Sequence, residues 1–334
     1  MKITVMGAGT WGMGLAILLA NNGNEVTVWS AVPAEIDMLQ TTRTHKNLPG
    51  AVIPDSMKFT KDLEEATREP ELIVMAVASV FTRRTAKLVS PYIREGQVIV
   101  NVAKGIEEDT LAVLTQQISE EIPQAVVAVL SGPSHAEEVS RGIPTSVVIA
   151  AEKRETAEWL QEIFMSPVFR VYISPDILGI ELGGALKNVI ALAAGIADGL
   201  GYGDNTKAAL ITRGMAEIAR LGLAMGARSE TLYGLSGIGD LIVTCASMHS
   251  RNRRAGILIG QGRTMQQAME EVNQVVEGVY STKAARALAL KYGVNMPITE
   301  AIYQVLFADL PAKDAVNKLL LRDKTVENPL LPWE

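Results

Sequence analysis

A single lysine inside an apolar stretch is the strongest candidate for chemistry in this sequence. Residues 180–195 contain no proline and carry apolar or small side chains at nearly every position, which predicts a buried helix. Lys187 and Asn188 interrupt its centre, and Gly183 and Gly184 leave space one turn earlier. Burial lowers the pKa of a lysine, so Lys187 could transfer a proton at neutral pH. A core helix whose lysine extends to the surface is the alternative.

A candidate partner for this lysine is Asp240, which lies in the apolar, glycine-rich stretch 237–244. A buried carboxylate requires a cationic partner, and Lys187 is a suitable one. The alternative role for an aspartate in this position is to cap the N-terminus of a helix.

A third chemical feature is the run of five polar residues 250–254. Ser250, Arg251 and Asn252 suit a phosphate, because arginine binds phosphate in a bidentate manner and small polar groups complete the contacts. Arg253 and Arg254 are typical of a solvated surface.

The N-terminal residues predict a scaffold that could hold a dinucleotide beside these groups. A strand at residues 2–6, a helix at about 12–21 and a strand at 25–29 surround a glycine turn. Gly7 permits the tight turn, Gly9 lets the backbone approach a pyrophosphate, and Gly12 lets helix and strand pack closely. The helix N-terminus then offers free N–H groups to the phosphates.

The choice between NAD and NADP is expected at the end of the second strand. This strand ends in Trp29-Ser30-Ala31, with neither an acidic residue nor an arginine, and the basic stretch 43–46 is more than ten residues away. The sequence therefore leaves the preference open. We expect both cofactors to be used with specificity constants within about tenfold of each other.

Further apolar strands are predicted at residues 72–77, 97–101 and 125–130, with helices between them. This alternation predicts a mainly parallel sheet covered on both faces. Ligands of such sheets bind beyond the carboxyl ends of the strands. Lys104 and the turn Gly132-Pro133-Ser134 follow two of these ends, so we expect them to belong to one site.

The pattern changes near residue 175, after which helices dominate, among them about 206–221, 264–272, 281–292 and 298–307. The chain is therefore predicted to form an α/β Rossmann-type domain, residues 1–175, and an all-α domain, residues 176–334.

Composition excludes several classes of protein. The formal net charge of −6 argues against a general nucleic-acid binder. The single cysteine allows no intrachain disulfide, and the three histidines have no metal-ligand spacing. The sequence has neither a secretory leader pattern nor an apolar run of roughly 18 residues, so we expect no membrane insertion and a cytoplasmic location.

Taken together, these stretches resemble the bacterial NAD(P)-dependent glycerol-3-phosphate dehydrogenases. The matching segments follow the family order and span nearly the whole chain: 7–12, 104–107, 131–134, 182–188, 237–241, 250–254 and 276–278. The combination is far more specific than any single segment.

The resemblance implies a Rossmann domain and a helical domain like that of 6-phosphogluconate dehydrogenase. It implies a homodimer that reversibly reduces dihydroxyacetone phosphate to sn-glycerol 3-phosphate for phospholipid synthesis. Lys187 would be the proton acceptor in the oxidation direction. The implied substrate contacts are Lys104, Gly132, Ser134, Lys187, Asp240, Ser250, Arg251 and Asn252. The implied cofactor contacts are Gly7, Gly9, Thr10, Trp11, Gly12, Lys104, Ala136, Arg251, Val275 and Glu277.

Two departures from the family pattern matter. Ala31 stands where an arginine or histidine often follows the second strand, which weakens the expected hold on a 2′-phosphate. Val77-Ala78-Ser79 replaces Val-Pro-Ser after a later strand, which we expect to loosen that turn without affecting the chemistry. A hydroxy-acid or ketopantoate reductase is the nearest alternative enzyme, and a dinucleotide-sensing regulator that lacks turnover is the non-enzymatic one.

Overall fold

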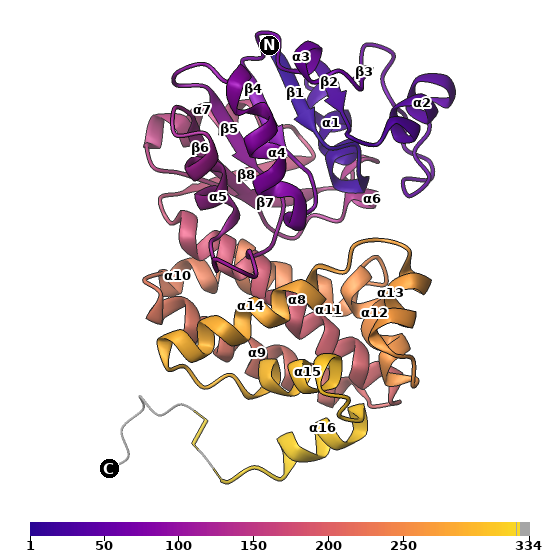
Figure 1. Cartoon of the computed structure of the whole chain (residues 1–334), viewed down its shortest axis with the longest axis vertical. Coiled ribbons are helices and arrows are strands. Elements are labelled where there is room, and N and C mark those ends of the chain that lie inside the picture. Colours follow the sequence, from indigo (N-terminus) through magenta and orange to yellow (C-terminus); the bar gives the residue numbers. More distant parts are fainter. Residues whose placement is uncertain (325, 328–334) are drawn as a thin grey trace.

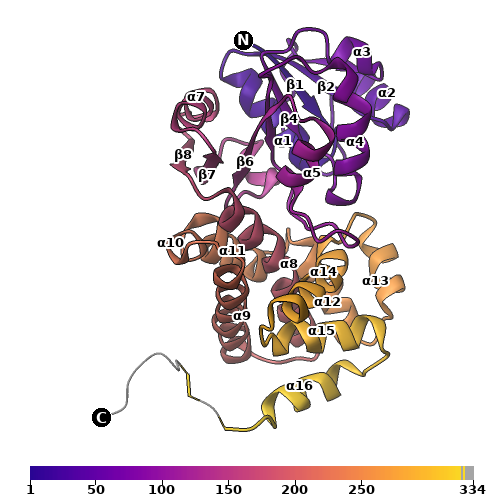
Figure 2. The ribbon, with the colours of Figure 1, turned by 60° about the vertical axis from the view of Figure 1, so that its left-hand side comes forward.

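The computed structural model describes residues 1–324, 326 and 327, so the last part of the predicted second domain lies outside the described residues. A sheet with flanking helices forms one part of the molecule and a group of helices forms the other (Figure 1). The view in Figure 2 shows the same separation, with α8 beginning directly below the sheet.

The sheet has eight strands in the order β3-β2-β1-β4-β5-β6-β7-β8. Every neighbouring pair is parallel except β6 and β7. The predicted mainly parallel sheet is therefore confirmed. The strands are β1 Lys2–Met6, β2 Glu25–Trp29, β3 Lys58–Thr60, β4 Leu72–Met75, β5 Val98–Asn101, β6 Val126–Ser131, β7 Thr145–Ala151 and β8 Phe169–Ser174.

The sequence patterns do not predict β3, β7 and β8. β3 has only three residues, and β8 alternates buried and exposed positions at its start instead of forming an apolar run. The central strand β4 is buried along its whole length, as a strand covered on both faces must be. The helices of this part are α1 Thr10–Asn21, α2 Pro33–Thr42, α3 Leu63–Ala66, α4 Thr82–Val89, α5 Leu114–Glu121, α6 Ala136–Val139 and α7 Arg154–Phe164.

The second part is built around α8, Ile177–Gly199, which is buried along most of its 23 residues. The Asp176 side chain caps it by accepting a hydrogen bond from the Gly179 N–H at 2.9 Å. The helices expected near 206, 264, 281 and 298 are present. Within the described residues, α8 is followed by α9 Asp204–Ala224, α10 Ser229–Leu232, the π-helical turn Leu235–Gly239, α11 Asp240–Ala246, α12 Arg251–Gly260, α13 Met265–Val272, α14 Glu277–Tyr292, α15 Pro297–Phe307 and α16 Ala312–Leu320.

Helices α8 and α12 touch backbone to backbone, because glycines face each other where they cross. A Cβ on Gly195 would lie 2.1 Å from the Arg253 carbonyl oxygen, and a Cβ on Gly256 would lie 2.3 Å from that of Leu192. Gly199 and Gly260 repeat this contact one turn further along. A side chain at these positions would force the two helices apart.

By length and hydropathy, α8 resembles a membrane span, although Glu181 and Lys187 interrupt its apolar run. The bent pair formed by residues 229–246 and 251–260 passes the same test. In α8, 89% of the most apolar window is buried inside the protein, as in the core helix of a globular domain.

Candidate active site

The Lys187 ammonium group lies within a buried polar cluster. Its Nζ donates to Asp240 Oδ1 at 2.5 Å and to Thr244 Oγ1 at 2.6 Å. The second carboxylate oxygen, Asp240 Oδ2, accepts a hydrogen bond from Lys104 Nζ at 2.6 Å. The predicted pairing of Lys187 with Asp240 is therefore confirmed. Asp240 is the first residue of α11, and Gly239 occupies the cap position instead.

Burial and charge set the protonation of this cluster. Burial lowers the pKa of Lys187 to about 8, and the neighbouring Lys104 adds to this, whereas Asp240 opposes it. Burial acts to raise the pKa of Asp240, but attraction to Lys104 and Lys187 outweighs it and holds the pKa below its usual value. Lys187 thus combines a fixed position with a pKa close to neutrality, which is what proton transfer at C–O bonds requires.

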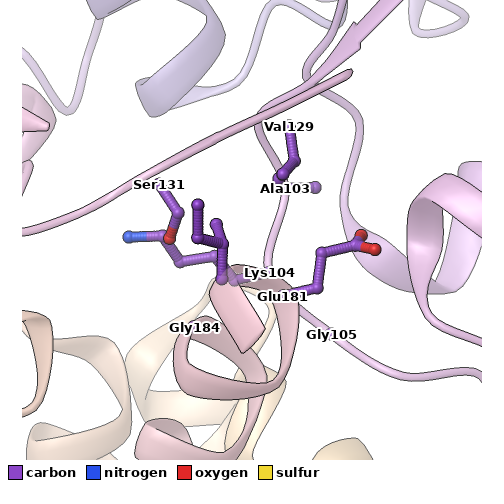
Figure 3. Close-up of a pocket in the computed structure, with 8 residues that line it drawn as sticks. Ala103, Lys104, Gly105, Val129, Ser131, Glu181 and Gly184 are labelled. Atoms are coloured by element: carbon purple, nitrogen blue, oxygen red, sulfur yellow. The ribbon is translucent and has the colours of Figure 1, made fainter. Parts of the chain in front are cut away.

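Lys104 reaches this cluster from the other domain, where it follows β5. Its Nζ also donates to the Gly132 carbonyl oxygen at 2.9 Å, and the Ser134 hydroxyl donates to the same oxygen at 3.0 Å. The carboxyl ends of β5 and β6 therefore meet at one site, as predicted. Figure 3 shows the small pocket beside Gly184, from which the Lys104 and Glu181 side chains extend to opposite sides.

The N-terminus of α12 lies against the same helix, α8. The Ser250 hydroxyl caps α12 by accepting from the Arg253 N–H at 3.1 Å. Asn252 donates to Asn188 Oδ1 at 2.9 Å and accepts from the Gly278 N–H at 2.8 Å. Asn252 thereby joins α8, α12 and α14, and its amide retains one N–H for a further partner.

Arg251 is the least constrained of the predicted phosphate-binding residues. Burial lowers its pKa, while Glu277 and Glu137 oppose that shift. Among the residues that the structure describes, no hydrogen bond or salt bridge to its guanidinium is found. This free cation beside α8 is suited to an anionic group of a ligand.

The next two arginines are not the solvated surface that the sequence indicates. Arg253 binds Asp198 through Nε and Nη2, both at 2.8 Å, and its side chain is only 12% exposed. In Arg254, the Nε atom is buried and lacks a hydrogen-bond partner among the described residues. The expectation is wrong for Arg253, because α12 packs closely on α8 and brings this side chain to Asp198.

The glycine turn after β1 has the geometry that a dinucleotide needs. Gly7 has φ of +122°, and a Cβ there would lie 2.8 Å from the Ala76 carbonyl oxygen. A Cβ on Gly12 would lie 2.1 Å from the Gly7 carbonyl oxygen, so this helix start packs as closely as predicted. Gly9 faces open space, with no described atom within 4 Å of its ideal Cβ position. A pyrophosphate can therefore approach the backbone at the N-terminus of α1.

Thr10 and Trp11, the first residues of α1, are fixed by neighbouring loops. The Trp11 Nε1–H donates at 3.0 Å to the carbonyl oxygen of Val102, two residues before Lys104. Thr10 Oγ1 accepts from Asn47 Nδ2 at 3.2 Å. The Thr10–Trp11 segment therefore links the glycine turn to the end of β5.

The remaining predicted cofactor residues lie on two sides of this region. Ala136 begins α6 and packs on α1, 3.3 Å from the ideal Cβ position of Gly14. Val275 precedes α14, whose first residue is Glu277. The Glu277 carboxylate accepts from the Ser79 N–H at 3.1 Å and from the Ser79 hydroxyl. The turn 77–79, expected not to affect the chemistry, therefore contacts a predicted cofactor residue of the other domain.

The end of β2 differs from the sequence expectation, which placed no acid there. The Ser30 hydroxyl donates to Glu35 Oε2 at 2.7 Å, so the first turn of α2 brings a carboxylate to this strand end. The stretch 43–46, distant in sequence, also returns to the glycine turn. The side chain of His45 interacts with the Ala8 backbone. Distance along the sequence did not predict this proximity, because the loop after α2 returns to the glycine turn.

Two residues of this region were not singled out from the sequence. Glu181 accepts from the Thr115 N–H at 2.9 Å and from the Thr115 hydroxyl, and burial raises its pKa to about 7. Glu181 could have been identified from the sequence by the argument used for Lys187, because it is a charged residue within an apolar helix. His135 has a buried Nε2 without a partner among described residues, and burial lowers its pKa to about 4. Within the described chain, no group of three or more metal-binding side chains is found.

A glycine turn on a Rossmann-type sheet faces a buried lysine–aspartate pair supplied by a helical domain. These features define a two-domain nicotinamide-dependent dehydrogenase.

Comparison with known sequences identifies the family. Residues 2–157 match the family model described as the N-terminus of NAD-dependent glycerol-3-phosphate dehydrogenase, and residues 176–317 match the model of its C-terminus. The chain therefore belongs to the NAD-dependent glycerol-3-phosphate dehydrogenase family.

Individual relatives agree with this assignment. The chain is 60% identical over 334 residues to a glycerol-3-phosphate dehydrogenase [NAD(P)+] from Agathobacter rectalis, covering 100% of this chain and 99% of the relative. A Fusobacterium nucleatum enzyme of the same name is 56% identical, with 98% of each chain covered. The crystal structure of glycerol-3-phosphate dehydrogenase from Coxiella burnetii superimposes with a TM-score of 0.93 at 37% identity, covering 96% of this chain and 99% of that one. A Ralstonia eutropha ketopantoate reductase, 15% identical with a TM-score of 0.61, shares the fold alone.

Proposed function

We propose that this protein catalyses the reversible, NAD(P)H-dependent reduction of dihydroxyacetone phosphate to sn-glycerol 3-phosphate. The observation that carries the proposal is the buried Lys187 ammonium group, held by Asp240 between the two domains, with Arg251 on the neighbouring helix. The names of the relatives support the same substrate.

A dihydronicotinamide dinucleotide held at the glycine turn would supply the hydride for C2 of the ketone. The protein must deliver a proton to the C2 oxygen, and Lys187 is the donor. At pH 7 its pKa of about 8 leaves it mostly protonated, so it can donate in reduction and accept the proton back in oxidation. Asp240 and Thr244 fix the direction of its N–H groups.

Lys104 has a supporting electrostatic role. Its ammonium group shares the Asp240 carboxylate with Lys187, which places a second positive charge near the carbonyl that develops alkoxide character. Such preorganised charge stabilises the transition state more than the ground state. The Lys104 contact to the Gly132 carbonyl also fixes the turn that carries Ser134.

The substrate phosphate is assigned to the N-terminus of α12. Arg251 supplies the charge-assisted contact, and Ser250, the remaining Asn252 N–H and the helix N-terminus supply weaker ones. Fixing the phosphate on a rigid helix keeps C2 aligned with Lys187 on α8.

The wider organisation is part of the same proposal. The last strand ends at Ser174 and α8 begins at Ile177, which supports a dinucleotide-binding domain of residues 1–175 and a substrate domain of residues 176–334. Residues 325 and 328–334 of the latter lie outside the described part. A homodimer, a cytoplasmic location and a role in phospholipid synthesis follow from the family resemblance.

Substitution of the proposed proton donor tests the function. Lys187→Met removes the charge and keeps the side-chain length, so turnover with dihydroxyacetone phosphate should fall by at least about 10²-fold. NAD(P)H affinity, measured by fluorescence, should persist, because the glycine turn lies in the other domain. Near-normal kcat in the folded variant would transfer the acid–base role to Lys104.

Lys207→Met is the matched control, since Lys207 is also salt-bridged in the helical domain, to Asp198 at 2.9 Å. It should retain wild-type turnover. Ketopantoate and 2-keto acids serve as alternative substrates. If the wild type reduced one of them faster than dihydroxyacetone phosphate, the proposed substrate would be wrong.

A further inference from the structure

A carboxylate from α2 lies at the end of β2, where the two cofactors differ. Glu35 belongs to the first turn of α2, and its Oε2 accepts the Ser30 hydroxyl at 2.7 Å. Ser30 directly follows β2, and the same hydroxyl oxygen accepts the Val32 N–H at 3.1 Å. Two hydrogen bonds therefore fix the turn between β2 and α2 and hold the carboxylate at the strand end.

His45 lies near both this carboxylate and the glycine turn. His45 interacts with the Ala8 backbone and is close enough to Glu35 and Glu137 for both carboxylates to raise its pKa, although burial lowers it overall. Asn47, two residues later, donates to Thr10 Oγ1. The loop 43–48 thus contacts the glycine turn, and Glu35 lies near both this loop and the end of β2.

The basic residues of this loop differ in their freedom to bind an added phosphate. Arg43 donates to the carbonyl oxygens of Asp55 at 2.5 Å and Met57 at 3.0 Å, and its guanidinium stacks 5.2 Å from the Phe59 ring centroid. Arg43 is therefore committed to the fold of the loop. Lys46 is exposed, and its mobile ammonium group is strongly hydrated.

In dinucleotide-binding domains, an acidic residue at the end of the second strand accepts hydrogen bonds from the adenosine ribose hydroxyls, and it repels a 2′-phosphate. We propose that Glu35 performs this role here, although it comes from the following helix rather than from β2, and that the protein therefore prefers NAD to NADP. Ser30 is the positioning residue that holds the carboxylate toward the ribose. The proposal rests on the proposed function only in requiring that a nicotinamide dinucleotide binds at the glycine turn.

Direct binding to the full chain tests this inference without turnover. Dissociation constants for NADH and NADPH are measured by fluorescence titration for the wild type and for Glu35→Gln. The wild type should bind NADH at least about tenfold more tightly, as expected for repulsion between a carboxylate and a phosphate a few ångströms apart. This preference exceeds the one expected from the sequence alone, which placed no carboxylate at the end of β2. Glu35→Gln should reduce this ratio by about 10-fold or more, mainly through tighter NADPH binding.

Asp37→Asn is the matched control, because Asp37 lies on the same helix in an exposed salt bridge with Lys61. It makes the same chemical change and should leave the ratio within about twofold of the wild type. A ratio that Asp37→Asn and Glu35→Gln change equally would indicate a general charge effect and overturn the assignment. Equal wild-type affinities for NADH and NADPH would overturn it as well.

The same titrations separate this inference from the proposed reaction. If the protein bound NADH selectively through Glu35 but failed to reduce dihydroxyacetone phosphate, the selector role would hold and the proposed substrate would be wrong. If it reduced dihydroxyacetone phosphate with no preference between cofactors, the reaction would hold and the role of Glu35 would be wrong.

Discussion

Removal of the carboxylate that two lysines share is a demanding test of the active-site electrostatics. Asp240→Asn keeps the shape of the side chain and removes its charge. Lys187 and Lys104 then face a neutral amide in place of an anion that each contacts within 2.6 Å. Breaking a buried ion pair by neutralising one partner usually costs about 3–5 kcal/mol.

The structure indicates a smaller loss, because Lys187 can release its proton. With a pKa of about 8, its deprotonation in the folded protein at pH 7 requires only about 1 kcal/mol. This deprotonation energy is an upper limit on the loss of folding stability that the unpaired Lys187 can cause in Asp240→Asn. Lys104 is partly exposed and can be solvated. We therefore expect the free energy of unfolding to fall by about 1–3 kcal/mol at pH 7.

The loss should also depend on pH in a defined direction. At pH 9 Lys187 is already mostly neutral in the wild type, so removing Asp240 should then cost less than at pH 7. Urea denaturation of both proteins at the two pH values provides the measurement. Asp37→Asn, at an exposed salt bridge, is the control and should change stability by less than about 1 kcal/mol. A loss above about 4 kcal/mol at pH 7, or a loss that grows at pH 9, would refute this account of Lys187.

Two further predictions concern the phosphate site and a buried acid. Arg251→Ala should raise KM for dihydroxyacetone phosphate by at least about tenfold and barely affect the slow reaction of unphosphorylated dihydroxyacetone, because a charge-assisted contact is lost. Equal effects in steady-state assays of both substrates would make Arg251 a cofactor or structural residue. Burial raises the pKa of Glu181 to about 7, so its stabilising contribution is complete below pH 4.5 and lost as pH rises through 7. Relative to the wild type, Glu181→Gln should therefore gain about 3 kcal/mol in unfolding free energy between pH 4.5 and pH 8, and a constant difference would contradict the assignment.

Local patterns predicted the scaffold well. The strand, glycine turn and helix of residues 2–21 follow from neighbouring residues whose roles are set by backbone geometry. The Lys187–Asp240 pair was predictable for a different reason, since each charge is too costly to bury alone. A buried charge needs a partner of opposite sign whatever the sequence distance between the two residues.

The parts that were not predicted depend on contacts that no local pattern encodes. Glu35 lies five residues beyond Ser30 and reaches it only because α2 starts immediately after the turn. The sequence around Arg253 is typical of a surface, but the close glycine contact between α8 and α12 places its side chain beside Asp198. Lys104 and Ser79 pair with carboxylates of the other domain, and such pairs require the relative placement of the two domains.

In the proposed reaction, the backbone contact between α8 and α12 would also set the length of substrate that fits. Lys187 lies on α8 and Arg251 at the start of α12, so the glycine contact between these helices fixes the distance from the proposed proton donor to the proposed phosphate site. The fixed distance between the two helices would then select a three-carbon phosphate by its length, without contacts along its carbon chain. Discrimination against longer or shorter phosphorylated ketones would then depend on glycines that lie at the helix crossing rather than on residues in contact with the substrate.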